Sequence, residues 1–107
     1  MSERIPTPPR GLSKRSKENW RLVHQGWHLD DAGRPMLRVA LSAEDRADEA
    51  QAIVKREGMI ILVGKVRRAH PALQIVKDSQ LIALKAWRQL GLQGAPAGAA
   101  GRPPGVV

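Results

Sequence analysis

Cysteine, phenylalanine and tyrosine are absent from the 107-residue chain, and tryptophan occurs only three times. Without cysteine there is no disulfide framework, no cysteine-ligated zinc site and no thiol nucleophile. No apolar run approaches the ~18 residues of a membrane span, and the polar, proline-containing N-terminus lacks the apolar centre of a signal sequence. We therefore expect a protein of a reducing, cytoplasm-like compartment. So few aromatic side chains in so short a chain also indicate association as a source of stability.

The formal net charge is +8, and it is unevenly distributed. Residues 1–27 hold six basic side chains and two acids (+4), residues 28–57 hold five and seven (−2), and residues 58–92 hold six and one (+5). Basic segments favour a polyanionic partner, of which nucleic acid is the commonest. The alternative is a solvated basic surface without a specific partner.

Two long segments carry apolar residues at alternating steps of three and four. The first series is Met36, Ala40, Ala43, Ala47, Ala50 and Val54; the second is Leu73, Val76, Gln80, Ala83, Trp87 and Leu90. Such spacing places each series on one face of a helix. Because alanine lets another helix approach closely, we predict an antiparallel helical hairpin packed seam to seam over residues 30–92.

Each apolar stripe is wider than one partner helix needs. The residues that widen the two stripes are Leu37, Leu41 and Ile53 in the first helix, and Ile75, Ile82 and Leu84 in the second. We expect the apolar surface that the partner helix does not cover to pack on the N-terminal segment, on neighbouring subunits, or on both.

Capping residues mark the ends of these helices. Asp30 or Asp31 is expected to cap the first helix, which runs to Glu57 before Gly58, and His70-Pro71 opens the second, which ends at Leu90 before Gly91. Between them, residues 59–63 and 66–70 flank a Gly-Lys turn, which is typical of a β-hairpin. The predicted fold is therefore mostly α: an N-terminal helix plus a long antiparallel helical hairpin, with a short β-hairpin between the long helices.

The N-terminal part divides into an arm and a helix. Residues 1–11 contain three prolines and two arginines, and we expect a mobile basic arm that either follows a phosphate backbone or is an unstructured end. Ser13 is a good N-cap for a basic helix within residues 12–28, ending near His24 or Gln25 with Gly26 as its stop. Its apolar side is expected to pack on the hairpin, which makes Trp20 and Trp27 core residues rather than base-stacking ones. The glycine-, alanine- and proline-rich tail, residues 93–107, is expected to be disordered.

Nothing in the sequence indicates catalysis. Glu44 and Asp48 lie four residues apart, but no base, nucleophile and orienting group accompany them. His24 and His28 have a spacing that metal ligands use on helices, yet Gly26 between them argues against a continuous helix. We therefore predict no enzyme, no metal and no cofactor.

Four stretches together resemble the small subunit of phage terminase, of the siphovirus and prophage type. They are PPRGLSKRSKENW at residues 8–20, ALSAEDRADEAQAIVKREG at residues 40–58, RRAHPAL at residues 67–73, and LKAWRQLGL at residues 84–92. The resemblance implies a non-enzymatic, ring-forming factor in the host bacterial cytoplasm. It implies binding to viral double-stranded DNA and recruitment of the large terminase subunit, which holds the ATPase and nuclease.

The chain departs from that family in its short C-terminal tail and in the lack of a clear helix-turn-helix recognition helix. Combining charge and resemblance, we predict DNA contacts by Arg10, Lys14, Arg15, Lys17 and Arg21 first, and by Lys65, Arg67 and Arg68 second. The predicted oligomer or core residues are Leu37, Ala40, Leu41, Ala47, Ile53, Val54, Ile60, Leu62, Leu73, Val76, Leu84 and Trp87. Two alternatives stay open: an oligomeric adaptor for an acidic protein, and a small basic RNA-binding protein.

Overall fold

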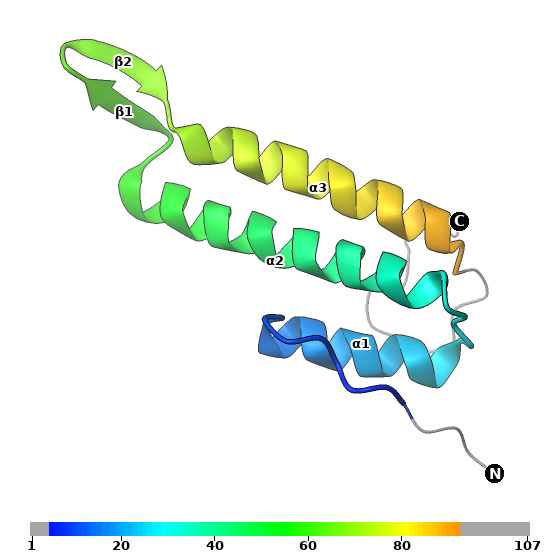
Figure 1. The fold of residues 1–107 in the computed structure, drawn as a ribbon. Helices are drawn as coiled ribbons and strands as arrows, with labels where there is room; N and C mark the ends of the chain where they lie inside the picture. The colour runs from blue at the N-terminus through cyan, green and yellow to red at the C-terminus, as the bar shows by residue number, and fades with distance from the viewer. Residues whose placement is uncertain (1–4, 93–107) are drawn as a thin grey trace.

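A computed structural model describes residues 5–92, which form three helices and one two-stranded antiparallel sheet. The elements are α1 (Lys14–Gly26), α2 (Gly33–Glu57), β1 (Ile60–Val63), β2 (Val66–Ala69) and α3 (Pro71–Leu90). Helices α2 and α3 lie antiparallel, the β-hairpin projects beyond one end of the pair, and α1 runs beside the other half (Figure 1). The predicted mostly helical fold with a β-hairpin between the long helices is confirmed. The predicted tail and the first four residues of the predicted arm lie outside the described residues.

Small side chains line the contact between α2 and α3. Helix α2 buries Ala40, Ala43, Ala47 and Ala50, as predicted from their spacing. On α3 the buried residues are Ala72, Ser79, Ala83 and Ala86, so the predicted seam is wrong at Gln80, which is exposed. Small residues from both helices face one another because only they permit close approach of the two backbones. The larger Leu73 and Trp87 are half-buried beside that seam.

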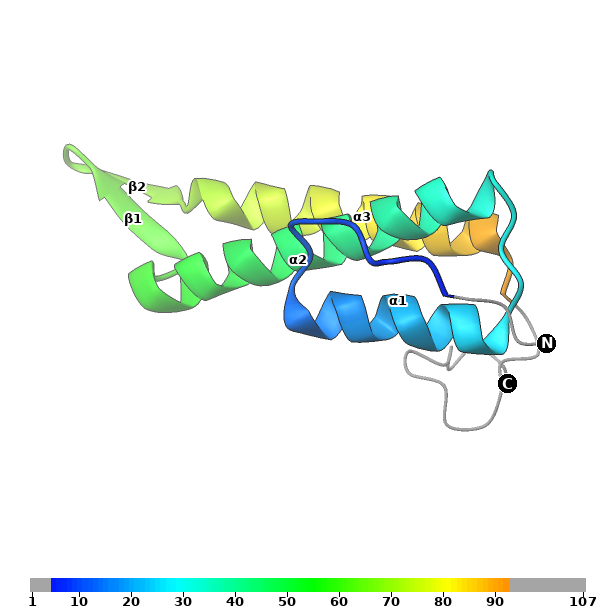
Figure 2. The same ribbon diagram turned by 60° about the horizontal axis from the view of Figure 1, so that its bottom comes forward.

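The core lies where all three helices run together. Its buried large side chains come from α1, α2, the segment between them and the residues just before α1: Leu12, Trp20, Val23, Leu29, Leu37 and Leu41. Trp87 and Leu90 of α3 pack against this cluster. Figure 2 shows that α1 stops short of the β-hairpin end, which leaves the outer half of the α2–α3 pair without a third helix. The surplus apolar surface is therefore only partly covered by the N-terminal segment.

The N-terminal segment is packed rather than free over residues 5–12. The Trp20 indole nitrogen donates a 2.8 Å hydrogen bond to the carbonyl of Pro6, while Ile5 and Leu12 contact the core. Proline keeps this segment extended, as expected. The expectation of a mobile arm is wrong for these residues, because a buried indole N–H requires an acceptor and Pro6 supplies it.

Local caps account for the helix ends. The Ser13 hydroxyl accepts from the Ser16 amide, which confirms the predicted cap of α1. At α2 the formal N-cap is Ala32, but the Asp30 carboxylate accepts from the amides of Ala32 and Gly33, so it performs the predicted capping from outside the helix. Gly91 ends α3 with a positive φ of 59°, as glycine commonly does.

The β-hairpin is exposed on both faces. Ile60 pairs with Ala69 and Val63 with Val66 around the Gly64-Lys65 turn, which confirms the predicted strands to within a residue at each outer end. Leu62 is 68% exposed, and its neighbours in both strands are mostly exposed as well. Such an apolar ribbon presents its surface and its free strand edges to another molecule.

Candidate nucleic-acid interface

Most of the predicted DNA-contacting residues near the N-terminus lie on the surface of α1 and just before it. Arg10, Lys14 and Arg21 are exposed, and Lys17 is half-exposed. Steps of three and four place Lys14, Lys17 and Arg21 on one side of α1. No carboxylate in residues 5–92 pairs with these three or with Arg10. We refer to Arg10, Lys14, Lys17 and Arg21 as the α1 basic face, and it is free to meet phosphate.

Arg15 is different, because it is bound within the domain. Its guanidinium lies 2.7 Å from an Asp48 carboxylate oxygen and 3.9 Å from Glu44, both on α2. Both ends of the closer pair are about half exposed, with side-chain exposures of 55% and 52%. Arg15 therefore ties α1 to α2, and a phosphate contact would have to compete with that ion pair.

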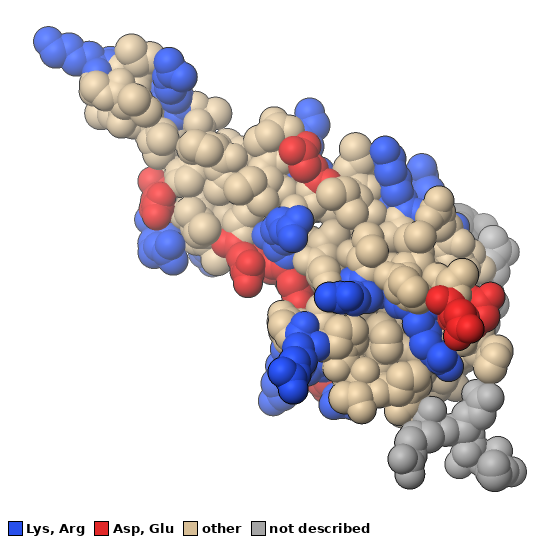
Figure 3. All heavy atoms as spheres, in the orientation of Figure 1, with Lys and Arg blue, Asp and Glu red and all other residues tan. Residues whose placement is uncertain are grey.

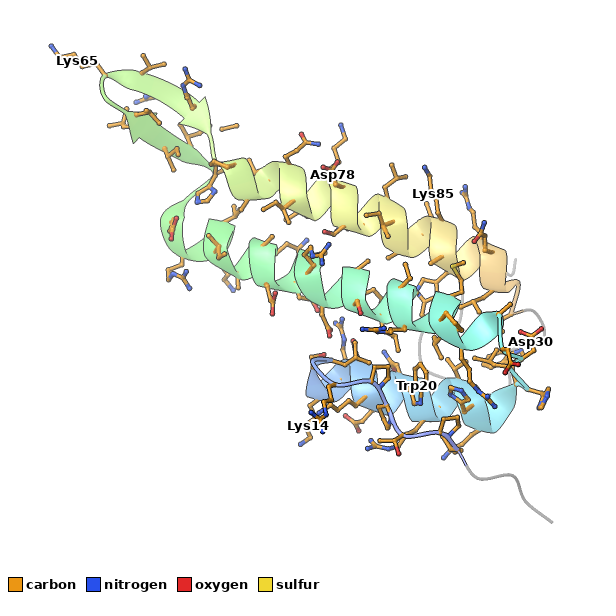
Figure 4. The ribbon with its side chains drawn as sticks, viewed as in Figure 1. Lys14, Trp20, Asp30, Lys65, Asp78 and Lys85 are labelled. Carbon is orange, nitrogen blue, oxygen red and sulfur yellow. The ribbon has the colours of Figure 1, made fainter. Side chains whose placement is uncertain are left out.

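The second predicted group, Lys65, Arg67 and Arg68, lies on the β-hairpin. All three side chains are exposed, and none has an ion-pair partner among the described residues. Figure 4 shows Lys65 at the tip of the β-hairpin and Lys14 at the N-terminal end of α1, well separated along the molecule. The fold thus forms two basic regions at different places and does not merge them into one site.

A third basic group was not predicted. Arg34, Arg38 and Arg46 of α2 line a groove of about 580 Å³, together with Trp20 of α1 and Ile82 of α3. Basic side chains spread over α2 between its two neighbouring helices on the face shown in Figure 3. The signal was present in the sequence, since Arg34, Arg38, Ser42 and Arg46 follow one another at steps of four.

The start of α1 is held in place by a network of hydrogen bonds to Asp45. The Ser13 amide and hydroxyl donate to its carboxylate at 2.7 Å each, and the Ser16 hydroxyl donates at 2.6 Å. Partial burial by itself raises the pKa of Asp45, but the hydrogen bonds from Ser16 and Ser13, with the nearby Arg15 charge, lower it below the usual value. An ionised Asp45 therefore fixes the orientation in which α1 presents its basic face.

The structure separates the predicted oligomer or core residues into three groups. Leu37, Ala40, Leu41 and Ala47 are buried within the domain. Half-buried side chains form the second group, which comprises Ile53, Val54, Leu73, Val76 and Trp87. Ile60, Leu62 and Leu84 are exposed, at 58%, 68% and 46%. Another subunit can therefore contact the three exposed residues and the exposed portions of the half-buried side chains.

His24, the first of the two histidines four residues apart, is held by its own helix. The Nδ1 of His24 donates to the carbonyl of Trp20 at 2.8 Å, and its ring lies 4.5 Å from the Trp20 ring. Residues 5–92 contain no grouping of three or more His, Asp or Glu side chains able to hold a metal ion. In the same residues no helix has the length and hydrophobicity of a membrane span.

Comparison of the chain with protein-family models, with curated proteins and with solved structures gives no match.

Proposed function

We propose that this chain is an oligomeric, non-catalytic DNA-binding factor of viral genome packaging, of the terminase small-subunit type. It would bind viral double-stranded DNA and bring it to a large subunit that carries the ATPase and nuclease. The observation that carries the proposal is the α1 basic face: Lys14, Lys17 and Arg21 lie on one side of α1 around Glu18, Arg10 is exposed just before the helix, and none of these four cations forms an ion pair with a carboxylate in residues 5–92. Phosphate contacts of this kind supply affinity without reading sequence.

The exposed β-hairpin supports assembly into oligomers. Its apolar side chains remain in contact with water in a single copy, and a symmetric assembly would bury them while repeating the α1 basic face around an axis. Several weak phosphate-binding faces on one particle bind far more tightly than one. A ring is the assembly that the family resemblance favours.

The DNA part of the proposal is tested by electrophoretic mobility shift with duplex DNA at two salt concentrations. Lys14→Glu/Arg21→Glu should abolish the shift, whereas the charge-matched control Lys77→Glu/Arg88→Glu on α3 should retain it. Affinity should fall with salt at a slope of roughly 0.9 per phosphate contact. Absence of a shift at low salt overturns the proposal, and stronger binding to structured RNA than to duplex DNA favours the RNA-binding alternative.

The oligomer part is tested by native mass measurement. The unmodified chain should give a multimer, and Leu62→Lys in the hairpin should lower the subunit number, because it places a charge on the surface proposed to be buried. A Lys77→Glu control, on the outer side of α3, should not. Folded single copies of the unmodified chain at micromolar concentration contradict the assembly.

A further inference from the structure

We infer that the open furrow between α2 and α3, where Arg38, Val39 and Arg46 of α2 lie beside Ile82 of α3, is a docking site for an amphipathic helix with acidic flanks from another protein. The inference is independent of DNA binding. Helix α1 runs beside only part of the length of the α2–α3 pair (Figure 2), and it contributes the buried Trp20 to this furrow. A different groove lies where Arg15 and Asn19 of α1 meet Gln80 of α3.

The furrow has the spacing of a helix-binding surface. Val39, Arg46 and Ile53 recur at steps of seven along α2, and Ile75 and Ile82 recur at the same step along α3. Steps of seven keep residues on one narrow stripe of a helix. Val39 and Ile82 border the same groove as Arg46. Val39, Ile75 and Ile82 are 43%, 44% and 43% exposed, so apolar side chains stand on both sides of the furrow.

Charge specifies the partner further. Arg38 and Arg46 are exposed beside this apolar stripe, and neither pairs with a carboxylate in residues 5–92. A helix that places apolar residues at i, i+4 and i+7 on the furrow, with acidic residues beside them, would cover the apolar stripe and pair with the exposed Arg38 and Arg46. Arginine also suits carboxylate geometrically, because its guanidinium forms two parallel hydrogen bonds.

A second copy of this chain does not supply such a helix. Of the carboxylates in residues 5–92, all except Glu18 and Glu49 already accept a hydrogen bond or face a cation within the domain. Those two lie on different helices, α1 and α2. We therefore assign the acidic flanks to a different protein.

Nucleic acid also fits this furrow poorly. Its backbone presents phosphate but no apolar groups at helical spacing, and would leave Val39, Ile75 and Ile82 uncovered. The aromatic ring in the groove, Trp20, is only 4% exposed, so it cannot stack on a base.

The test uses the full chain and two fluorescein-labelled peptides of about 18 residues, or five helical turns. The first is an amphipathic helix with leucine at i, i+4 and i+7 and glutamate on both flanks; the second is a scrambled peptide of the same composition. At physiological ionic strength the first should bind more tightly, and in amide NMR spectra it should shift the signals of Val39, Arg46 and Ile82. Equal binding of the two peptides, or no binding of the first, overturns the inference.

Variants separate the furrow from general charge. Arg38→Glu/Arg46→Glu should weaken binding of the helical peptide at least about tenfold, as loss of paired charges across an interface does. The control Lys77→Glu/Arg88→Glu makes the same change of charge on the outer side of α3. It should change the affinity for the helical peptide by less than about twofold. Ile82→Ser should weaken binding of the helical peptide while leaving the affinity for duplex DNA unchanged. If Arg38→Glu/Arg46→Glu lowers DNA affinity but not peptide affinity, the furrow is a nucleic-acid surface and the inference is wrong.

Discussion

His70 and Glu57 join the ends of the two long helices, with the His70 Nε2 lying 2.7 Å from a Glu57 carboxylate oxygen. Glu57 is the last residue of α2, and His70 is the N-cap of α3, where its Nδ1 accepts from the Ala72 amide. The His70 amide also donates to the carbonyl of Met59 at 2.7 Å. One buried imidazole thus closes the neck from which the β-hairpin projects.

Replacing His70 should separate its two roles. His70→Ala removes the cap and the Glu57 contact, and should lower the free energy of unfolding by about 1–2 kcal/mol. His70→Asn restores a good N-cap but does not reach Glu57, so it should recover most of that loss if the cap dominates. Urea denaturation at neutral pH measures both. An alanine variant as stable as the unmodified chain would show that the neck contributes nothing.

Asp45 should make stability depend on acid pH. Its pKa is lowered in the folded chain by the hydrogen bonds from Ser16 and Ser13, so its contribution is complete above the ordinary value of 3.8 and is lost as pH falls through the lower, folded value. Asp45→Asn should lower the free energy of unfolding by about 1–2 kcal/mol at neutral pH. The difference in unfolding free energy between the variant and the unmodified chain should narrow as pH drops below 3.8. Urea midpoints across that range provide the measurement. Asp78→Asn, at an exposed carboxylate bonded to Gln74, is the control, and a gap that stays constant with pH contradicts the prediction.

Arg15 should behave as a structural residue and Lys14 as a binding one. Arg15→Gln breaks the ion pair with Asp48 and should cost up to about 1 kcal/mol of stability, the range for exposed pairs. Lys14→Gln should leave stability unchanged but weaken duplex DNA binding more than Arg15→Gln does. Fluorescence anisotropy and urea denaturation on both variants decide between the roles. Equal losses of DNA affinity would place Arg15 back in the binding face.

The alanine seam should be intolerant of larger side chains. Ala47→Leu inserts three carbons where α2 meets α3 and should lower the free energy of unfolding by about 1–3 kcal/mol. Ala52→Leu, on an exposed position of the same helix, should change it by less than about 0.5 kcal/mol. Thermal melts compare the two. Similar melting temperatures for the Ala47→Leu and Ala52→Leu variants would contradict the prediction, because α2 and α3 would then have room for a larger side chain at Ala47.

Sequence alone determined the elements of this protein, because their signals are local. Ser13, His70-Pro71 and Gly91 mark helix ends, Gly64-Lys65 marks the β-turn, and steps of three and four mark the buried faces. Local chemistry sets each of these whatever the rest of the chain does.

Only the tertiary structure decided which charges and apolar residues remain available to partners. Arg15 and Lys14 are neighbours in sequence, yet packing of α1 on α2 pairs Arg15 with Asp48 and leaves Lys14 exposed. The same packing leaves the Arg38 and Arg46 furrow open and assigns Gln80 to the surface. Availability depends on which neighbours a side chain meets across space, and helical periodicity does not contain that information.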